Sequence, residues 1–446
     1  MSRSFRVQRT LVPVLAASLV WPSPVLGQTA PAATPTAPAP QAGGAATEPA
    51  SNSGAPPVSA PVPPVATAGP VSFTALADLD SMNLVAGGVT RGSKLLAKAA
   101  FSASYDGASD GHDGLTALAS LQFAGGGHIS ADNVGDIQGI DNIEAYGALR
   151  VYEVWVARQY QGGKFGWKAG LTDLNADFDT QQVASLFLNS SDGTGAELGH
   201  SGINGPAIYP TTALAFSGFA KLGNSVIVRA GLFDGTAGTP YHPGVFAIRL
   251  SGRDGALLIE QVEKTLDSGV RMVGGGWAYT ALFGALHRFD AAGNAVRLQR
   301  ERGAFGLVEG TLTHDGDNGE RGLSAWVRLG LGDPVVERIS GYIGAGVVYS
   351  GPLARRPGDQ VGLGINHAIV DRPDLPDPTQ AARLAETAFE LTYKYNANEW
   401  LAVQPDAQMV VHPNGDRGIP AALVLGVRLN VTLTRGLVRK LREATP

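Results

Sequence analysis

Segments of about ten residues that alternate apolar and polar side chains recur between Ser72 and Leu433, and turn-forming residues separate them. In LVLGVRLNVTL (423–433), Leu425 and Val427 fall on one face of an extended chain, whereas Arg428 falls on the other. This period of two predicts β-strands with two chemically different faces. The pattern therefore favours an all-β protein.

Sixteen such segments are predicted, and longer and shorter connections alternate between them. Their ranges are 72–83, 94–105, 115–123, 147–160, 165–174, 211–221, 226–233, 255–266, 270–287, 305–313, 322–330, 339–350, 359–370, 385–395, 400–412 and 421–433. An even number of strands with such asymmetric connections is typical of an outer-membrane barrel. We predict an up-and-down antiparallel transmembrane β-barrel of about 16 strands, with long extracellular loops and short periplasmic turns.

The polar faces support a barrel whose interior holds water. No segment after the N-terminus has the ~18 uninterrupted apolar residues of a transmembrane helix, so a membrane-embedded form must be a closed barrel. An arginine at the lipid-facing midplane costs roughly 2–4 kcal/mol, which places Arg229, Arg328 and Arg428 on the lumen side. A secreted soluble β-protein would show the same alternation. The small apolar residues of the other face and the single meander favour the membrane barrel.

The termini differ in composition from the barrel. Arg3, Arg6 and Arg9 precede an apolar stretch at 11–20, and Val25-Leu26-Gly27 fits a cleavage site, so 1–27 is predicted to be a signal peptide. Residues 28–71 are rich in Ala and Pro and are predicted to form a disordered linker. The barrel is expected at 72–433, followed by a basic C-terminal tail at 434–446.

Composition and motifs exclude several functions. The net charge is −5, which argues against a nucleic-acid partner. The chain has no Cys, and its eight His show no metal-ligand spacing. Neither HExxH, GxSxG nor a P-loop is present. We therefore expect no enzyme activity, no cofactor and no metal site.

Four stretches carry a more specific signal. They are LRVYEVWVARQYQGGKFGWKAGLTDLNADF (149–178), LFLNSSDG (186–193), GYIGAGVVYSGPLARRPGDQVGLGINHA (341–368) and ETAFELTYKYNANEWLAVQPDAQMVVHPNG (386–415). Their order and spacing resemble the carbohydrate-selective porins, the OprB-like family, across nearly the whole barrel region. The resemblance implies a sixteen-stranded barrel in the outer membrane of a Gram-negative bacterium, surrounded by lipid and passing carbohydrate solutes by diffusion. It leaves a monomer and a homo-oligomer such as a trimer open. The tail TRGLVRKLREATP departs from the C-terminal aromatic residue that many such barrels carry.

A sugar-selective pore needs hydrogen-bonding groups and an aromatic surface around a narrow point. Trp155 and Trp326 are candidate stacking platforms, and inward arginines and acids are candidate partners of sugar hydroxyls. The predicted pore-lining residues are Glu153, Trp155, Gln159, Arg229, Trp326, Arg328, Gln404, Asp406, Gln408 and Arg428. Each could instead be solvated wall or brace the barrel, as we expect for Glu309 and Glu390.

The connection 175–210 is the longest, and we predict that it folds inward and narrows the channel. Its candidate constriction residues are Phe187, Asn189, Ser190 and Ser191. An external lid is the alternative. On the strand at 400–412, Pro405 lies on the predicted lipid face, where its missing N–H requires a bulge or a local irregularity.

Two other functions fit the sequence. One is a general or anion-preferring outer-membrane porin, and the other is a secreted, non-transporting glycan-binding β-protein.

Overall fold

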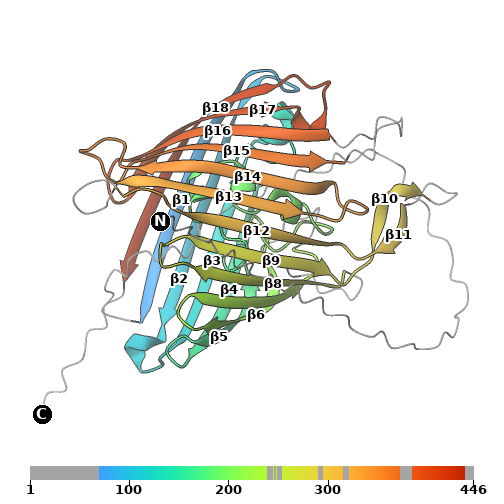
Figure 1. The fold of residues 1–446 in the computed structure, drawn as a ribbon. Coiled ribbons are helices and arrows are strands. Elements are labelled where there is room, and N and C mark those ends of the chain that lie inside the picture. The colour runs from blue at the N-terminus through green and yellow to red at the C-terminus, as the bar shows by residue number, and fades with distance from the viewer. Residues whose placement is uncertain are drawn as a thin grey trace, which may run out of the picture. The chain divides into compact units, whose positions relative to one another are not determined.

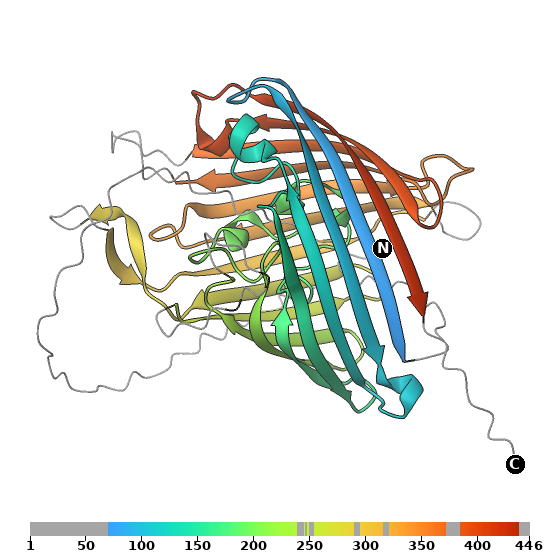
Figure 2. The ribbon, with the colours of Figure 1, turned by 180° about the vertical axis from the view of Figure 1, so that it is seen from behind.

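A closed barrel of sixteen antiparallel strands confirms the predicted fold class. The computed structural model describes residues 70–238, 245, 248, 254–289, 295–314, 321–371 and 384–436. Each strand pairs with its neighbours along the barrel, and β18 closes against β1 (Figure 1), so that the first and last strands lie side by side (Figure 2). The predicted signal peptide, most of the linker and most of the tail lie outside the described residues.

The strand bounds lie close to the predicted ones. The barrel strands are β1 (Val71–Ala86), β2 (Gly92–Asp106), β3 (Leu115–Gly126), β4 (Ala148–Tyr160), β5 (Phe165–Thr172), β6 (Ala213–Leu222), β7 (Val226–Asp234), β8 (Ala256–Thr265), β9 (Arg271–Tyr279), β12 (Arg302–Thr311), β13 (Gly322–Leu331), β14 (Ile339–Ser350), β15 (Gln360–Val370), β16 (Leu384–Asn396), β17 (Leu401–Val411) and β18 (Ala422–Gly436). β18 runs three residues beyond the predicted strand because Thr434, Arg435 and Gly436 pair with β1.

One predicted strand is wrong. The segment 270–287 is not continuous, because β9 ends at Tyr279 and β10 (Phe283–Phe289) pairs with β11 (Ala295–Gln299) in a separate two-stranded sheet. Apolar residues continue through Phe283 to Leu286, so the pattern contains no break. The pairing of β9 with β8, which ends at the Leu257–Tyr279 pair, sets the end of the barrel strand.

The longest connections gather at one end of the barrel, which we call the loop end. Its connections are 87–91, 127–147, 173–212, 235–255, 280–301, 332–338, 371–383 and 412–421. The opposite turn end carries 107–114, 161–164, 223–225, 266–270, 312–321, 351–359 and 397–400. A strict alternation of long and short connections is wrong for two loop-end connections: 87–91 is shorter than 107–114, and 332–338 is shorter than both 312–321 and 351–359. The extra length of 107–114 includes the 3₁₀ turn η1 (Gly107–Asp110).

The two faces of the strands have the predicted chemistry. On β13, Val327 and Leu329 are 46% and 53% exposed on the outside, whereas Trp326 and Arg328, which alternate with them, are buried inside. The same alternation places Gln122 of β3 inside. Aliphatic side chains therefore form the outer surface, where lipid is the expected solvent.

Pro405 of β17 is accommodated without a bulge. Its strand stays in register with β18 through the pair Pro405–Val427. On the β16 side, pairing is interrupted between Thr392–Asp406 and Tyr395–Val403, with no change of register. The predicted local irregularity is thus a short gap in one hydrogen-bond ladder, which absorbs the missing N–H.

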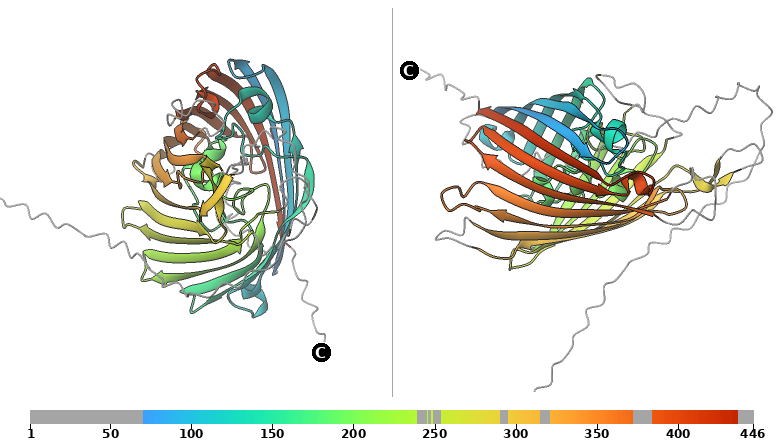
Figure 3. Two further views of the ribbon diagram at one scale, coloured as in Figure 1. Left: turned by 90° about the vertical axis from the view of Figure 1, so that its right-hand side faces the viewer. Right: turned by 90° about the horizontal axis from the view of Figure 1, so that it is seen from above.

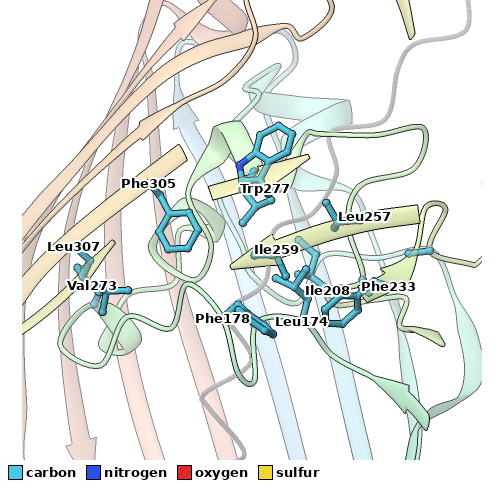
Figure 4. Close-up of a cluster of buried hydrophobic side chains, with 14 of the residues drawn as sticks. Leu174, Phe178, Ile208, Phe233, Leu257, Ile259, Val273, Trp277, Phe305 and Leu307 are labelled. Carbon is cyan, nitrogen blue, oxygen red and sulfur yellow. The ribbon is translucent and has the colours of Figure 1, made fainter. Parts of the chain in front are cut away.

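The connections 127–147 and 173–212 lie inside the ring of strands, as the green segments in Figure 3 show for the second of them. We call 173–212 the inner segment. It includes the turns η3 (Ala184–Leu186) and η4 (Ser190–Asp192) and the short helix α1 (Ala196–Gly199). Leu174, Phe178 and Ile208 pack against Phe233 and Ile259 of the wall (Figure 4). Among the described residues, no helix is both long and apolar enough to cross a membrane.

Candidate functional site

Glutamates on the barrel strands accept hydrogen bonds from backbone N–H groups of both interior connections, 127–147 and 173–212. Glu309 of β12 accepts hydrogen bonds from the N–H groups of Gln182 and Val183 at 3.1 and 2.9 Å. Glu390 of β16 accepts in the same way from Leu188 and Asn189 at 2.6 and 2.9 Å. A carboxylate has two oxygens and matches two consecutive N–H groups of a turn, and those of the buried residues Leu188 and Asn189 would otherwise lack partners.

The connection 127–147 is fixed in the same manner. Glu386 of β16 accepts hydrogen bonds from Ile137 N and Gln138 N, both at 2.9 Å. The two interior connections also bond to each other, because Ser190 N donates to the carbonyl oxygen of Gly139 at 2.9 Å. Together they form one layer that covers part of the wall.

Arg328 joins the inner segment to β13. Its guanidinium donates to both oxygens of Asp179, at 2.9 and 2.7 Å, and to both oxygens of Glu197, at 3.0 and 2.8 Å. None of the three side chains is exposed. A side chain at Gly195 would overlap the guanidinium, and one at Gly330 would overlap the Glu197 carboxylate, so both glycines leave the space that the pair occupies.

Arg428 of β18, five strands away around the barrel, holds the connection 127–147 in the same way. It bonds to Asp80 of β1 and reaches Asp141 at 3.0 Å and the side-chain oxygen of Asn142 at 2.8 Å in the connection 127–147. Its side chain is 8% exposed. Arg328 and Arg428 point inward as predicted, but each is already bonded to carboxylates and holds an interior connection.

The inward-facing polar residues of β17 are also covered by the interior connections. Gln404 donates to the carbonyl oxygen of Leu186 and Gln408 to that of Ile140, both at 2.7 Å. Gln404, Asp406 and Gln408 are at most 5% exposed. The strand pattern places these side chains inside correctly, but the interior connections separate them from water.

The predicted constriction residues are covered by the wall and by the connection 127–147: Phe187 and Asn189 contact wall residues, whereas Ser190 and Ser191 bond to Gly139 and Gln138. Phe187, Asn189, Ser190 and Ser191 are at most 1% exposed. The Phe187 ring lies edge-on to Trp326 at 6.2 Å between centroids, so Trp326 offers no free face to a solute. Inward folding of the segment therefore matches the prediction, but these four residues anchor the segment instead of bordering open space.

Partly exposed polar groups border the other side of the inner segment. Its residues Asp177 and Thr180 are half-buried, and Gln182 and Ser185 are exposed. Lys168 of β5 forms an ion pair with Asp177 and is 13% exposed. These side chains give the uncovered side of the segment a polar, water-accessible surface.

Trp155 of β4 stands beside this surface. It is half-buried, and the Lys168 ammonium lies 5.3 Å from the centroid of its ring. Its indole N–H donates to Glu153, which is buried, at 3.1 Å. Gln159, farther toward the turn end, is exposed. Of the predicted residues on β4, Trp155 and Gln159 can thus reach solvent.

A chain of ion pairs crosses four neighbouring strands. Arg229 of β7 and Arg271 of β9 both bond to Glu263 of β8, at 3.0 and 3.1 Å. Arg271 also bonds to Glu309 at 2.6 Å and to the carbonyl oxygen of Thr180 at 2.8 Å. Arg229 is 24% exposed, so the chain of ion pairs runs from the buried Glu309 beside the inner segment to a side chain in contact with solvent.

Four residues beside this surface are absent from the predicted pore lining: Lys168, Asp177, Glu263 and Arg271. Lys168 and Glu263 lie on inward faces by the period of two, so face assignment alone could have found them. Asp177 carries no such signal because it lies in an irregular connection. In the described parts of the chain, no group of three or more His, Cys, Asp or Glu is arranged to hold a metal ion.

A family model describes most of this chain. The model named carbohydrate-selective porin, OprB family, matches residues 97–433, which run from within β2 to within β18 and include both interior connections. The chain belongs to this family. The porin is also similar to Porin B of Pseudomonas aeruginosa, with 25% identity over 344 residues that cover 68% of this chain and 74% of that protein. Family and fold indicate a channel rather than an enzyme.

Solved structures of related channels show the same fold. The high-pH structure of Pseudomonas putida OprB superposes with a TM-score of 0.72 at 19% identity, covering 82% of this porin and 94% of that chain. The low-pH structure of the same protein gives 0.52 at 15% identity, covering 82% and 93%. At these identities the likeness supports the fold of the porin, and the family match supports its place in the outer membrane of a Gram-negative bacterium.

Proposed function

We propose that the porin lets carbohydrates diffuse across the outer membrane, and that Trp155, Lys168, Asp177, Arg229 and Glu263 contact them. The observation that carries this assignment is the partial exposure of these five side chains beside the inner segment, whose other side is bonded to the wall. The family match supports sugars as the solute class.

The chemistry of this surface suits a sugar. Each sugar hydroxyl donates and accepts hydrogen bonds, and the pairs Lys168–Asp177 and Arg229–Glu263 offer both kinds of group. The indole of Trp155 adds an apolar surface for a sugar ring. Because these groups remain partly in water, each contact replaces a bond to water and stays weak, which lets the solute leave.

Liposome swelling tests the solute class. Vesicles containing the porin should swell faster in mono- and disaccharides than in amino acids of similar size. Equal rates for all solutes would support the general porin, and faster entry of inorganic anions would support the anion-preferring one. A chain that forms no pore and migrates on a denaturing gel identically before and after boiling would support the secreted glycan-binding protein.

Two substitutions test the residue assignment. Trp155→Ala and Arg229→Gln should each weaken the block of ion current by sugars several-fold, since each removes one set of contacts. Trp400→Ala provides a matched control, because Trp400 is 49% exposed in the connection 397–400 at the turn end. If sugar block is unchanged in both Trp155→Ala and Arg229→Gln, the assigned contacts are wrong, whereas the solute class rests on the swelling rates.

A further inference from the structure

Arg150 is a buried arginine with free hydrogen-bond donors. It is the third residue of β4 at the loop end, and its side chain points into the barrel and is 4% exposed. Its Nη2 donates to the carbonyl oxygen of Tyr146 at 3.4 Å, a long contact. Neither Nε nor Nη1 has a hydrogen-bond partner.

The other inward-facing arginines of the described barrel strands differ from Arg150. Arg229, Arg271, Arg328 and Arg428 each bond to a carboxylate at 3.1 Å or less. Arg150 forms no ion pair with any carboxylate in the described part of the chain. A buried guanidinium without a counter-charge is costly, so the position calls for an anion.

A second free donor lies directly opposite. Gln122 of β3 pairs with Arg150 across the ladder, and both side chains face inward. Residues in opposite positions have Cβ atoms about 4.5–5.5 Å apart. Gln122 is also 4% exposed, and its Nε2 has no partner. Three donor groups from two neighbouring strands are therefore unbonded in one region.

We propose that Arg150 and Gln122 bind an oxyanion, such as the carboxylate or phosphate of an acidic sugar, inside the loop end of the channel. The donors fit an oxyanion better than water, because a water molecule accepts only two hydrogen bonds and neutralises no charge. A planar guanidinium binds a carboxylate or phosphate through two parallel N–H groups, and the Gln122 amide adds a third donor. The inference rests on the proposed function and extends its solutes to anionic sugars.

Calorimetric titration of the full-length, detergent-solubilised porin tests this site with three probes. Glucuronate carries a carboxylate where glucose has a hydroxymethyl group, and inorganic phosphate is an oxyanion without a sugar. Glucuronate should bind with a Kd about tenfold lower than that of glucose, as expected for charge-assisted hydrogen bonds. Phosphate should raise the apparent Kd of glucuronate and leave that of glucose unchanged. Tighter binding of glucuronate than of phosphate identifies a sugar acid as the ligand, and the reverse identifies a free anion.

Substitutions test whether Arg150 and Gln122 produce the preference for glucuronate over glucose. Arg150→Gln should abolish the preference for glucuronate over glucose, and Gln122→Leu should reduce it several-fold. Lys94→Gln removes the same charge from a partly exposed side chain at the loop end that already pairs with Asp132, and should leave the preference unchanged. If Arg150→Gln lacks the heat-modifiable migration of a folded barrel, Arg150→Lys and Gln122→Leu provide the test.

The outcomes separate this inference from the proposed function. If wild-type porin binds glucuronate no better than glucose and does not bind phosphate, the oxyanion site is wrong, even when vesicles swell in glucose. The site is also wrong if a folded Arg150→Gln protein keeps the full preference. Failure of sugars to enter vesicles at all would instead contradict the proposed function.

Discussion

Arg328 of β13 and Glu197 of α1 are 131 residues apart in sequence and form two hydrogen bonds of 3.0 and 2.8 Å in a place where neither side chain is exposed. Asp179 completes the arrangement with bonds of 2.9 and 2.7 Å to the same guanidinium. One arginine thus fixes two points of the inner segment against one strand.

Removal of this arginine should destabilise the porin strongly. Arg328→Met leaves Asp179 and Glu197 buried without a counter-charge, and breaking a buried pair costs about 3–5 kcal/mol. Urea unfolding in detergent should report this loss. Arg302→Met is the matched control. Arg302 is 79% exposed, and its nearest carboxylate oxygen, on Asp333, is 4.0 Å away, so this ion pair is weak. A loss below 1 kcal/mol for Arg328→Met would show that the inner segment does not depend on this contact.

A methyl group at Gly330 should disturb the same contact. The added Cβ would lie 2.1 Å from the Glu197 carboxylate, so Gly330→Ala should cost about 1–3 kcal/mol and loosen the inner segment. Gly274→Ala on the outer face meets no atom within 4 Å and should change little. Unfolding midpoints of the two variants and greater noise in the open-channel current of Gly330→Ala are the measurements. Equal midpoints for both would argue against close packing at Gly330.

Glu301 should make stability depend on pH. It is 2% exposed beside the inner segment and accepts a hydrogen bond from Gly202 N at 2.8 Å. Burial, with a smaller contribution from Asp333, raises its pKa from 4.5 to about 8, against the opposing effect of the Gly202 bond. The folded state therefore holds the proton more tightly, and stability falls as pH rises from about 4.5 to about 8.

Glu301→Gln should remove this dependence. The amide stays neutral and can still accept the Gly202 hydrogen bond. As pH rises through that window, the free energy of unfolding of the variant should therefore increase relative to that of the wild type, by up to about 1.4 kcal/mol per pH unit. Unfolding free energies at pH 5 and pH 8 give the comparison, with the exposed turn residue Glu399→Gln as control. An identical pH profile for wild type and Glu301→Gln would contradict the assignment.

Glu260 should destabilise the barrel in lipid. It is exposed on the outer face of β8, between Leu258 and Val262, which are 48% and 49% exposed, and its ladder partners are Ala230 and Gly276. Glu260→Leu should raise the free energy of unfolding in lipid vesicles by about 1 kcal/mol, because a charge facing hydrocarbon is unfavourable. Glu399→Leu in the connection 397–400 should stay within about 0.5 kcal/mol. A loss of stability in Glu260→Leu would indicate that Glu260 has a favourable partner in the membrane.

The fold was largely predictable because strand pattern is a local property. A period of two identified the sixteen strands and their faces, including the inward position of Arg328 and Arg428. It failed after Tyr279, where the apolar pattern continues although the chain leaves the barrel. Pairing with a neighbouring strand, which the pattern does not encode, determined that end.

The site was predictable only in part. Trp155 and Arg229 were predicted to line the pore and lie partly exposed beside the inner segment, whereas Gln404, Gln408 and Trp326 lie beneath the interior connections. Whether an inward side chain meets water or protein depends on the path of connections that have no periodic pattern. Asp177 and the anchoring of Phe187 are set by that path.

The sequence by itself determined that this chain is an outer-membrane barrel with a lipid-facing and a lumen-facing side, because alternation, strand number and the family motifs are local properties of the chain. Only the tertiary structure decided which lumen groups remain free. Glu309, Glu386, Glu390, Arg328 and Arg428 are bonded to the interior connections, and Arg150 is left with unbonded donors. The physical reason is that hydrogen bonds and ion pairs form between residues more than one hundred positions apart, and each group's partner depends on where both connections lie within the barrel.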